Sequence, residues 1–236
     1  MRSLSLIIPA YNEEARLPAT FLALEKYFSS REWGFLEILV VDDGSRDGTA
    51  EAVRKSPYKL LQNPGNRGKG YSVRHGMLEA KGEWVLFSDA DLSAPIEELD
   101  KLLEAAGSAG AAVAIGSRAV DRSLVSVHQS AMREYSGRFF NLVMRVLTGL
   151  PFKDTQCGFK LFRRDAAYEV ARRQKIDGFG FDVEQLYIAT QLGFKIVETP
   201  VRWANVEGTK VSLLRGLDAF ADIARTRWNG LAGRYK

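Results

Sequence analysis

Residues 36–45, LEILVVDDGS, combine a short apolar run with two aspartates and a Gly-Ser turn. An apolar run of this length, bounded by turn residues, is typical of a buried β-strand. Ligands of open parallel sheets bind outside the carboxyl ends of the strands. Asp42 and Asp43 therefore mark an edge of a sheet at which we expect a ligand to bind.

The same signal recurs on both sides of this stretch. Apolar runs also occupy residues 4–9, 84–87 and 111–115, with a weaker one at 56–61. Between the runs, apolar residues recur at helical spacing, as in residues 17–28. Strands that alternate with helices predict an α/β fold with a mostly parallel central sheet flanked by helices.

The pattern changes after Arg118. Residues 158–162, 182–192 and 195–201 form a mixed region, and amphipathic segments at 130–150 and 213–231 lie before and after it. No repeat, low-complexity tract or Pro/Ser-rich linker divides the chain. We therefore expect a single domain over residues 1–236, with a C-terminal elaboration in residues 119–236.

The composition is that of an ordinary globular protein, with 46% hydrophobic and 26% charged residues. The net charge of +4 suits anionic partners such as phosphates and membrane surfaces. The single cysteine, Cys157, excludes an intrachain disulfide and fits a reducing compartment. The start of the chain lacks the pattern of a signal peptide, and no stretch reaches the ~20 apolar residues of a spanning helix. Any membrane contact is therefore expected to be peripheral.

Two more aspartates follow the run at 84–87, in the triplet Asp89-Ala90-Asp91. Together with Asp42 and Asp43 they would repel one another at one sheet edge unless a cation lay between them. Carboxylate oxygens suit Mg²⁺ or Mn²⁺, which would bridge a diphosphate. The alternative is that Asp91 is a turn or helix-capping residue ahead of Pro95.

Several short motifs, taken in order, resemble those of a known family. PAYNE at 9–13, VDDGSRDGT at 41–49, NRGKG at 66–70 and DAD at 89–91 resemble the nucleotide-sugar half of family 2 glycosyltransferases. KDTQCGFKLF at 153–162, FDVE at 181–184 and WANVEGTK at 203–210 resemble dolichyl-phosphate β-glucosyltransferases. The resemblance implies the GT-A fold, with a nucleotide-sugar-binding half over residues 1–118 and an acceptor-binding half over residues 119–236.

The resemblance also implies the donor and its site. UDP-glucose is the expected donor, because residues 203–210 resemble the glucosyl and not the mannosyl relatives. The residues implied in donor binding are Pro9, Tyr11, Glu13, Val41, Asp42, Asp43, Gly68, Lys69, Asp89, Ala90, Asp91, Arg118 and Lys210. Asp89 and Asp91 would bind the metal. Related mannosyltransferases often carry a glutamine ligand two residues after the second aspartate, where this chain has Ser93, so water would take that place.

The acceptor can be argued from charge. An alcohol acceptor needs a general base, whereas a phosphate monoester, with a second pKa of ~6, is already an anion. The charge argument favours a phosphate acceptor, and the resemblance implies transfer, with inversion, to a polyprenyl or dolichyl phosphate. The residues expected to hold that phosphate are Arg118, Arg133, Arg138 and Gln156. The catalytic candidates are Asp91, Asp182 and Glu184, the last two as the base if the acceptor is an alcohol, or as caps of a helix start.

The two amphipathic segments have two interpretations. In residues 213–231, one helix face gathers Leu213, Leu217, Phe220, Ala224, Trp228 and Leu231. Such helices lie in the interface of a bilayer, or pack on the protein as most amphipathic helices do. With a lipid acceptor, we expect a cytoplasmic protein, peripheral on the cytoplasmic face of a membrane.

Two other functions remain open. A glycosyltransferase of the same fold that acts on a soluble sugar or polyol would need Glu184 as its base. A non-catalytic module would bind a nucleotide sugar without transferring it. Nucleic-acid binding is not expected, because the arginines accompany apolar helix faces and form no dense basic stripe.

Overall fold

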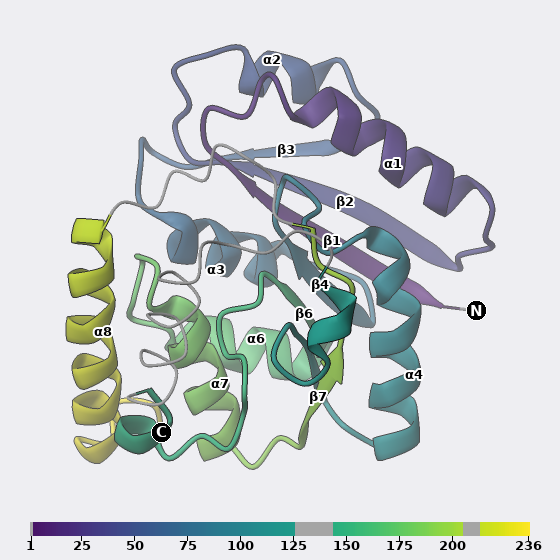
Figure 1. The fold of residues 1–236 in the computed structure, drawn as a ribbon. Coiled ribbons are helices and arrows are strands. Elements are labelled where there is room, and N and C mark those ends of the chain that lie inside the picture. Colours follow the sequence, from purple (N-terminus) through teal and green to yellow (C-terminus); the bar gives the residue numbers. More distant parts are fainter. Residues whose placement is uncertain (1, 126–143, 205–212) are drawn as a thin grey trace.

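The computed structural model describes residues 2–125, 144–204 and 213–236, the last range with side chains from residue 221 onward. Its centre is a seven-stranded sheet in the order β3-β2-β1-β4-β6-β5-β7 (Figure 1). The strands are β1 (Ser3–Ala10), β2 (Phe35–Asp42), β3 (Lys59–Gln62), β4 (Trp84–Ser88), β5 (Val113–Ser117), β6 (Phe159–Arg163) and β7 (Ile196–Pro200).

Parallel pairing dominates the sheet, as predicted. β1 is parallel to β2 and β4, so Ile7 lies opposite Leu39 on one side and Phe87 on the other. β2 is parallel to β3, and β5 is parallel to β7. β6 runs antiparallel to both of its neighbours, β4 and β5. The α/β prediction is confirmed, whereas the antiparallel direction of β6 was not predicted.

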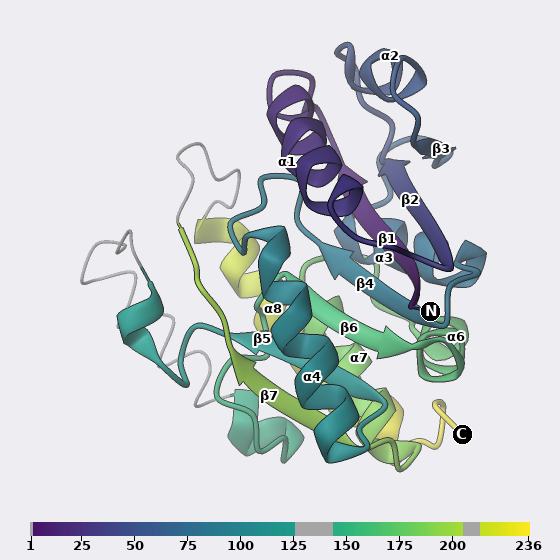
Figure 2. The same ribbon diagram turned by 90° about the vertical axis from the view of Figure 1, so that its right-hand side faces the viewer.

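Helices cover both faces of the sheet (Figures 1 and 2). They are α1 (Leu17–Ser29), α2 (Thr49–Arg54), α3 (Lys69–Glu79), α4 (Leu99–Ala109), α6 (Arg164–Arg173), α7 (Phe181–Gln191) and α8 (Leu213–Leu231), with short 3₁₀ turns at Ile96–Glu98 and Arg122–Leu124. α1, α2 and α4 pack into one apolar core together with strand residues from that face of the sheet, such as Leu6 and Val40. α3, α6 and α7 pack into a second core on the opposite face, around Ile7 and Phe87. The sheet is therefore buried on both sides, which explains why its strands read as continuous apolar runs.

The two halves expected along the chain share this one sheet. β6, from beyond residue 118, lies between β4 and β5. Its residue Leu161 is opposite Leu86 of β4 and Ala114 of β5. Because the second half supplies a central strand, residues on both sides of 118 contribute to the same core.

Two helices were not predicted. α2 has six residues, which is too short for a periodic apolar pattern to show. α6 buries the small residues Ala166, Ala167 and Ala171 together with Val170, whereas its one aromatic residue, Tyr168, is 51% exposed. Both helices have weak sequence signals because little bulky apolar surface marks their buried faces.

α8 has the predicted bounds. In the part of the helix whose side chains are described, however, residues of the predicted apolar face point away from the protein. Ile223, Thr226 and Asn229 are buried. Trp228 and Leu231, from the predicted apolar face, are 65% and 69% exposed. Of the other amphipathic segment, residues 144–148 are helical and residues up to 143 lie outside the described part. Among the described residues, no helix is long and apolar enough to span a bilayer.

Candidate active site at the carboxyl edge of the sheet

The carboxyl ends of β1, β2, β4 and β5 meet at one edge of the sheet, because these strands run in the same direction. The segments that follow them carry the residues predicted to bind the donor: Tyr11 and Glu13 after β1, Asp42 and Asp43 at the end of β2, Asp89 and Asp91 after β4, and Arg118 after β5. The fold thus brings these motifs to one place.

The loop after β1 is tied to the loop after β2. Asn12 has a φ of +54°, which asparagine tolerates better than most residues. Its amide N–H donates to Ser45 Oγ (2.9 Å), and its side-chain oxygen accepts from the Arg46 amide (2.8 Å). The Glu13 amide donates to Thr49 Oγ1 (2.8 Å). These bonds fix Tyr11 and Glu13, both half-buried, beside the end of β2.

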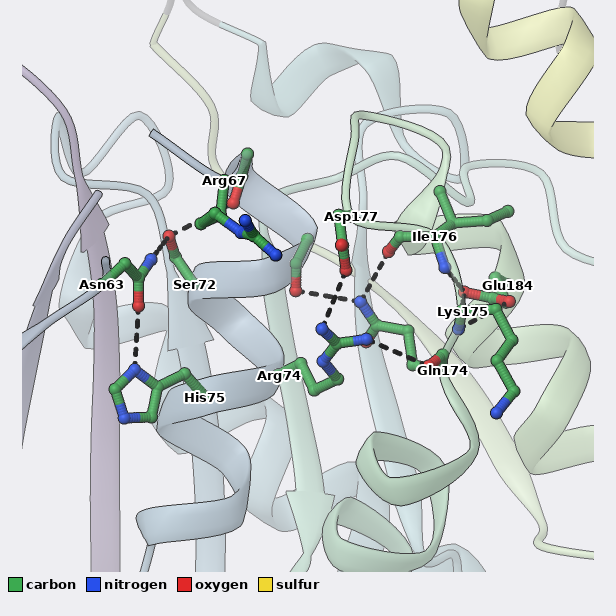
Figure 3. A network of polar contacts seen from close by, with 12 residues as sticks. Asn63, Arg67, Ser72, Arg74, His75, Gln174, Lys175, Ile176, Asp177 and Glu184 are labelled. Carbon is green, nitrogen blue, oxygen red and sulfur yellow. Dashed lines mark hydrogen bonds and ion pairs between the residues drawn. The ribbon is translucent and has the colours of Figure 1, made fainter. Parts of the chain in front are cut away.

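Asp43 holds the loop that starts α3. The Asp43 carboxylate is buried and accepts three hydrogen bonds, from Asn63 Nδ2 (2.8 Å), the Arg67 amide (2.9 Å) and the Gly68 amide (2.8 Å). Asn63 also donates to Ser72 Oγ (2.9 Å). Since both amide hydrogens of Asn63 are used, its oxygen accepts, and His75 Nδ1 at 2.8 Å is the donor (Figure 3).

This network changes the interpretation of part of the donor motif. Both oxygens of Asp43 are occupied within the protein, so the residue positions the loop around Gly68 and Lys69. Asp42 is buried and accepts from the Ser45 amide (3.0 Å). Val41 and Ala90 are buried, and their side chains pack in the apolar cores. Pro9 is half-buried near the end of β1.

Two lysine–aspartate ion pairs lie next to the triplet at residues 89–91. Lys69 Nζ is 2.6 Å from Asp89 Oδ1. Lys160, fully buried on β6, donates to the Cys157 carbonyl (2.6 Å) and forms a short ion pair with Asp182, the second residue of α7. Both ammonium groups lie near the Phe87 ring, at 5.3 Å and 5.8 Å from its centroid.

The turn that carries Asp89 and Asp91 is tightly constrained. Leu92 follows it with a φ of +48°, a strained value for a bulky residue of the kind often found at functional sites. A Cβ on Gly158 would lie 2.2 Å from Asp89 Oδ2, so any side chain there would displace this carboxylate. Asp91 Oδ1 accepts from the Ser93 amide (2.9 Å). The side chain of Asp91 therefore also shapes the turn, as the capping alternative predicted.

The two carboxylates suit a divalent cation that retains other ligands. Asp89 Oδ1 is buried and accepts no regular hydrogen bond, although Lys69 is close to it. Within residues 2–125, 144–204 and 213–236 no group of three acidic, histidine or cysteine side chains forms a complete metal site. Mg²⁺ and Mn²⁺ accept water and phosphate oxygens as further ligands. Asp89 and Asp91 thus fit such an ion if a bound diphosphate and water complete its shell.

Arg118 is held firmly at the β5 end of the site. Its Nε and Nη2 donate to the two oxygens of Asp154 (2.7 Å and 2.9 Å), and its amide also donates to Oδ2 (2.9 Å). The guanidinium lies over the Trp203 ring, 4.9 Å from its centroid. Burial alone would raise the pKa of Asp154, but the adjacent Arg118 charge holds it below its usual value. The backbone N–H of Gln156 donates to the same carboxylate (3.3 Å), so Asp154 links the backbone at Gln156 to Arg118.

Asp182 and Glu184 occupy different environments. Asp182 faces Lys160 and the charges around Asp89. Glu184 is fully buried, and its carboxylate accepts from the Lys175 amide (3.0 Å) and the Ile176 amide (2.8 Å) (Figure 3). It also accepts from Tyr235 Oη (2.6 Å). Burial raises the pKa of Glu184 despite these bonds. Its position argues against the predicted role as a base.

Glu184 instead anchors the loop packed on the start of α3. In that loop Gln174 Nε2 donates to the carbonyls of Gly70 (2.9 Å) and Ile176 (2.8 Å). Arg74 pairs with Asp177 (3.0 Å) (Figure 3). A Cβ on Gly68, whose φ is +105°, would lie 2.4 Å from the Asp177 carbonyl oxygen. Gly68 therefore allows the close contact that places Lys69 beside Asp89.

Lys160 and Asp154 are functional candidates that the sequence analysis missed. Lys160 stands between Phe159 and Leu161 in a buried strand, and an isolated charge in an apolar run was the available signal. Cys157, beside them, is buried, and burial raises the pKa of its thiol to about 12, in keeping with a structural role. The predicted site residues Arg133, Arg138 and Lys210 lie outside the described residues.

Comparison with known proteins identifies the family. Residues 5–171 match the model of glycosyl transferase family 2. The dolichyl-phosphate beta-glucosyltransferase of Dictyostelium discoideum is 34% identical over 250 residues, covering 99% of this chain and 76% of that protein. The human dolichyl-phosphate beta-glucosyltransferase is 33% identical over 252 residues, covering 100% of this chain and 78% of that protein.

A solved structure shares the fold. Glucosyl-3-phosphoglycerate synthase from Mycobacterium tuberculosis, crystallised with Mn²⁺, UDP and glucosyl-3-phosphoglycerate, aligns with a TM-score of 0.64 at 18% identity, covering 99% of this chain and 80% of that one. The fold is that of the GT-A class of glycosyltransferases. The chain belongs to glycosyltransferase family 2 and is a glycosyltransferase, similar over almost its whole length to dolichyl-phosphate β-glucosyltransferases.

The environment of Glu184 leads to a prediction. Glu184→Gln keeps an oxygen acceptor for the loop amides, so transfer should remain within about tenfold of wild type while stability falls by about 1–3 kcal/mol. Tyr235→Phe, which removes one donor to the same carboxylate, is the matched control and should act in the same direction with a smaller loss. Measurements of kcat/KM and of urea unfolding midpoints check both variants. A Glu184→Gln protein of wild-type stability that binds donor but has lost transfer more than a hundredfold would restore Glu184 as a catalytic base.

Proposed function

We propose that this glycosyltransferase moves glucose from UDP-glucose, with inversion, to dolichyl phosphate or a related polyprenyl phosphate, using Mg²⁺ or Mn²⁺. The carrying observation is that Asp89, Asp91 and Arg118 lie at one sheet edge in a chain similar, end to end, to dolichyl-phosphate β-glucosyltransferases. The carboxylates suit a metal-bound diphosphate, and the arginine suits an acceptor anion.

On the donor side, Tyr11 and Glu13 are proposed to contact the nucleoside, with Asp42 and Asp43 supporting the loops around it. Asp89 and Asp91 would hold the divalent ion, which supplies charge stabilisation to the departing diphosphate. The Mn²⁺ and UDP in the related glucosyl-3-phosphoglycerate synthase structure support this assignment. Lys210 stays a predicted phosphate contact.

On the acceptor side, the arrangement of Arg118 suits a phosphate. Asp154 occupies Nε and Nη2, and within the described part of the chain no partner takes Nη1. The side chain of Arg118 is 33% exposed, so a ligand can reach it. A charge-assisted hydrogen bond from a pre-positioned guanidinium is stronger than a neutral one. Gln156 stands nearby, and Arg133 and Arg138 remain predicted contacts.

A phosphate acceptor also agrees with the environments of the two candidate bases, Asp182 and Glu184. Glu184 is occupied in the interior, and Asp182 is paired with Lys160. A phosphate monoester needs no proton removed before it attacks the anomeric carbon. A soluble sugar or polyol acceptor would need a carboxylate freed from one of these contacts, and this disfavours that alternative.

We further propose that α8 contacts a membrane surface, where the lipid acceptor resides. Trp228 and Leu231 are exposed on one side of the helix, and Arg225 beside them has a 63% exposed side chain. Val146 and Leu147, from the other amphipathic segment, are 75% and 43% exposed. Exposed tryptophan and leucine flanked by arginine are typical of helices that lie in the interface of an anionic bilayer. Attachment at the cytoplasmic face remains part of the proposal.

The decisive experiment supplies donors and acceptors separately. The protein should transfer glucose from UDP-glucose to a polyprenyl phosphate in the presence of Mg²⁺ or Mn²⁺ and lose this activity with EDTA. GDP-mannose and soluble sugars or polyols are the comparison substrates. A preference for GDP-mannose would reverse the donor assignment, and transfer to a soluble alcohol alone would reverse the acceptor. Donor binding without transfer or hydrolysis would support a non-catalytic module.

Asp91→Asn should lower transfer by at least about a hundredfold, equivalent to ~2.7 kcal/mol in the barrier, because the metal then loses a carboxylate ligand. The fold should persist, since the asparagine oxygen can still accept from the Ser93 amide. Glu104→Gln, at an exposed position on α4, is the control and should be silent. Activity and circular dichroism measure the two effects. Retention of more than a tenth of wild-type activity at saturating metal would exclude Asp91 as a ligand.

The exposed face of α8 gives a prediction for membrane binding. Trp228→Glu combined with Leu231→Glu should reduce co-sedimentation with anionic vesicles at least tenfold, because each side chain would otherwise bury apolar surface worth about 1.5–3 kcal/mol. Leu22→Glu is the matched control, because Leu22 on α1 is 67% exposed and lies on the other face of the molecule. Equal effects of the two changes, or none, would contradict a specific role for α8.

A further inference from the structure

Lys69 occupies the position that a cation would take beside Asp89. Its Nζ lies 2.6 Å from Asp89 Oδ1, on one of the two carboxylates proposed to bind the divalent ion. A divalent ion bound to the same oxygen would strongly repel an ammonium group at that distance. The ion pair and the metal-bound state are therefore alternatives, and the Lys69 side chain has to move when the metal binds.

The backbone that carries Lys69 is fixed. Lys69 is the first residue of α3, directly after Gly68. The Gly68 amide donates to Asp43, and the glycine packs against the carbonyl of Asp177 with no room for a side chain. Because the loop is held on two sides, any adjustment falls to the four-carbon side chain. That side chain is 24% exposed.

The neighbouring lysine has no such freedom. Lys160 is fully buried, donates to the Cys157 carbonyl and pairs with Asp182. Both ammonium groups lie near the Phe87 ring. Lys160 is therefore a fixed charge beneath the site, whereas Lys69 is a charge at its surface that can exchange one anion for another.

The charges around the site favour that exchange. Asp89, Asp91 and Asp182 outnumber the two ammonium groups, so Lys69 reduces the repulsion among carboxylates in the metal-free protein. When a divalent ion takes over Asp89, the ammonium loses its partner. A nucleotide diphosphate bound to that ion would bring new anionic oxygens to the start of α3, where the amide groups of a helix amino terminus and Lys69 both favour negative charge.

We infer that Lys69 is an internal counter-ion that competes with the metal for Asp89 and passes to the donor diphosphate once metal and nucleotide bind together. The inference rests on the proposed metal site. Lys69 then weakens metal binding in the absence of nucleotide and strengthens nucleotide binding in the presence of metal. By linkage, the residue makes each of the two ligands favour the other.

Lys69→Met tests this, because methionine keeps much of the length of the side chain and removes the charge. Calorimetric titration with Mn²⁺ alone should show about threefold to tenfold tighter binding than wild type, since a competing charged contact is lost. Titration with UDP at saturating Mn²⁺ should show about tenfold weaker binding. Lys59→Met is the matched control: Lys59 lies at the β3 edge, 3.8 Å from Glu79, and both affinities should equal those of wild type.

The opposite signs of the two effects distinguish the inference from a structural role. A folded Lys69→Met protein whose affinity for Mn²⁺ alone is unchanged or weaker would overturn it. Lys69→Gln provides a second variant if the methionine protein unfolds, with the same outcomes. Wild-type protein that binds no Mn²⁺, with or without UDP, would overturn the proposed metal site as well, whereas normal Mn²⁺ binding with no effect of Lys69 would overturn this inference alone.

Discussion

The buried ion pair between Lys160 and Asp182 constrains much of the structure around the site. An ammonium group without solvent must be paired, and removing one partner of such a pair typically costs about 3–5 kcal/mol. Lys160 enters the interior because β6 inserts antiparallel between β4 and β5. Asp182 meets it only if the first turn of α7 docks against the sheet near Phe87. The pairing requirement therefore fixes β6 and α7 relative to the triplet at residues 89–91.

The carboxylates at this edge of the sheet are of two kinds, which differ in whether hydrogen bonds from the protein occupy their oxygens. Asp43, Asp154 and Glu184 are buried, and hydrogen bonds from the protein occupy them, so they hold a loop, an arginine and a second loop. Asp89 keeps a buried oxygen that, among the described residues, has Lys69 beside it and accepts no regular hydrogen bond. Sequence alone does not separate the groups, because both consist of acidic residues in or beside apolar segments. The difference depends on which backbone amides lie within hydrogen-bond distance, and that follows from tertiary packing.

The sequence predicted the elements that a strong local pattern marks. Strands β1, β2 and β4 and the bounds of α8 agree closely with the apolar runs and the helical periodicity. The direction of β6 was not predictable, because residues 159–163 read the same for either strand direction. The outward turn of Trp228 and Leu231 was left open, because periodicity identifies an apolar face without saying what covers it. The positions of the motifs after successive strands predicted that the site residues lie at one edge of the sheet. The structural role of Glu184 was not predictable, because it involves a hydrogen bond from Tyr235, which is distant in sequence.

The cations around the site differ in how firmly they are held, and that difference follows from their partners. Arg118 is held by two side-chain donors to Asp154 and by the Trp203 ring. Lys160 is enclosed by protein. Lys69 pairs with Asp89, and its side chain is 24% exposed. A transferase passes through states whose net charge changes as the metal, nucleotide and acceptor bind and leave. Fixed cations can stabilise one such distribution well, whereas a movable one can follow the negative charge from carboxylate to diphosphate without any change in the backbone.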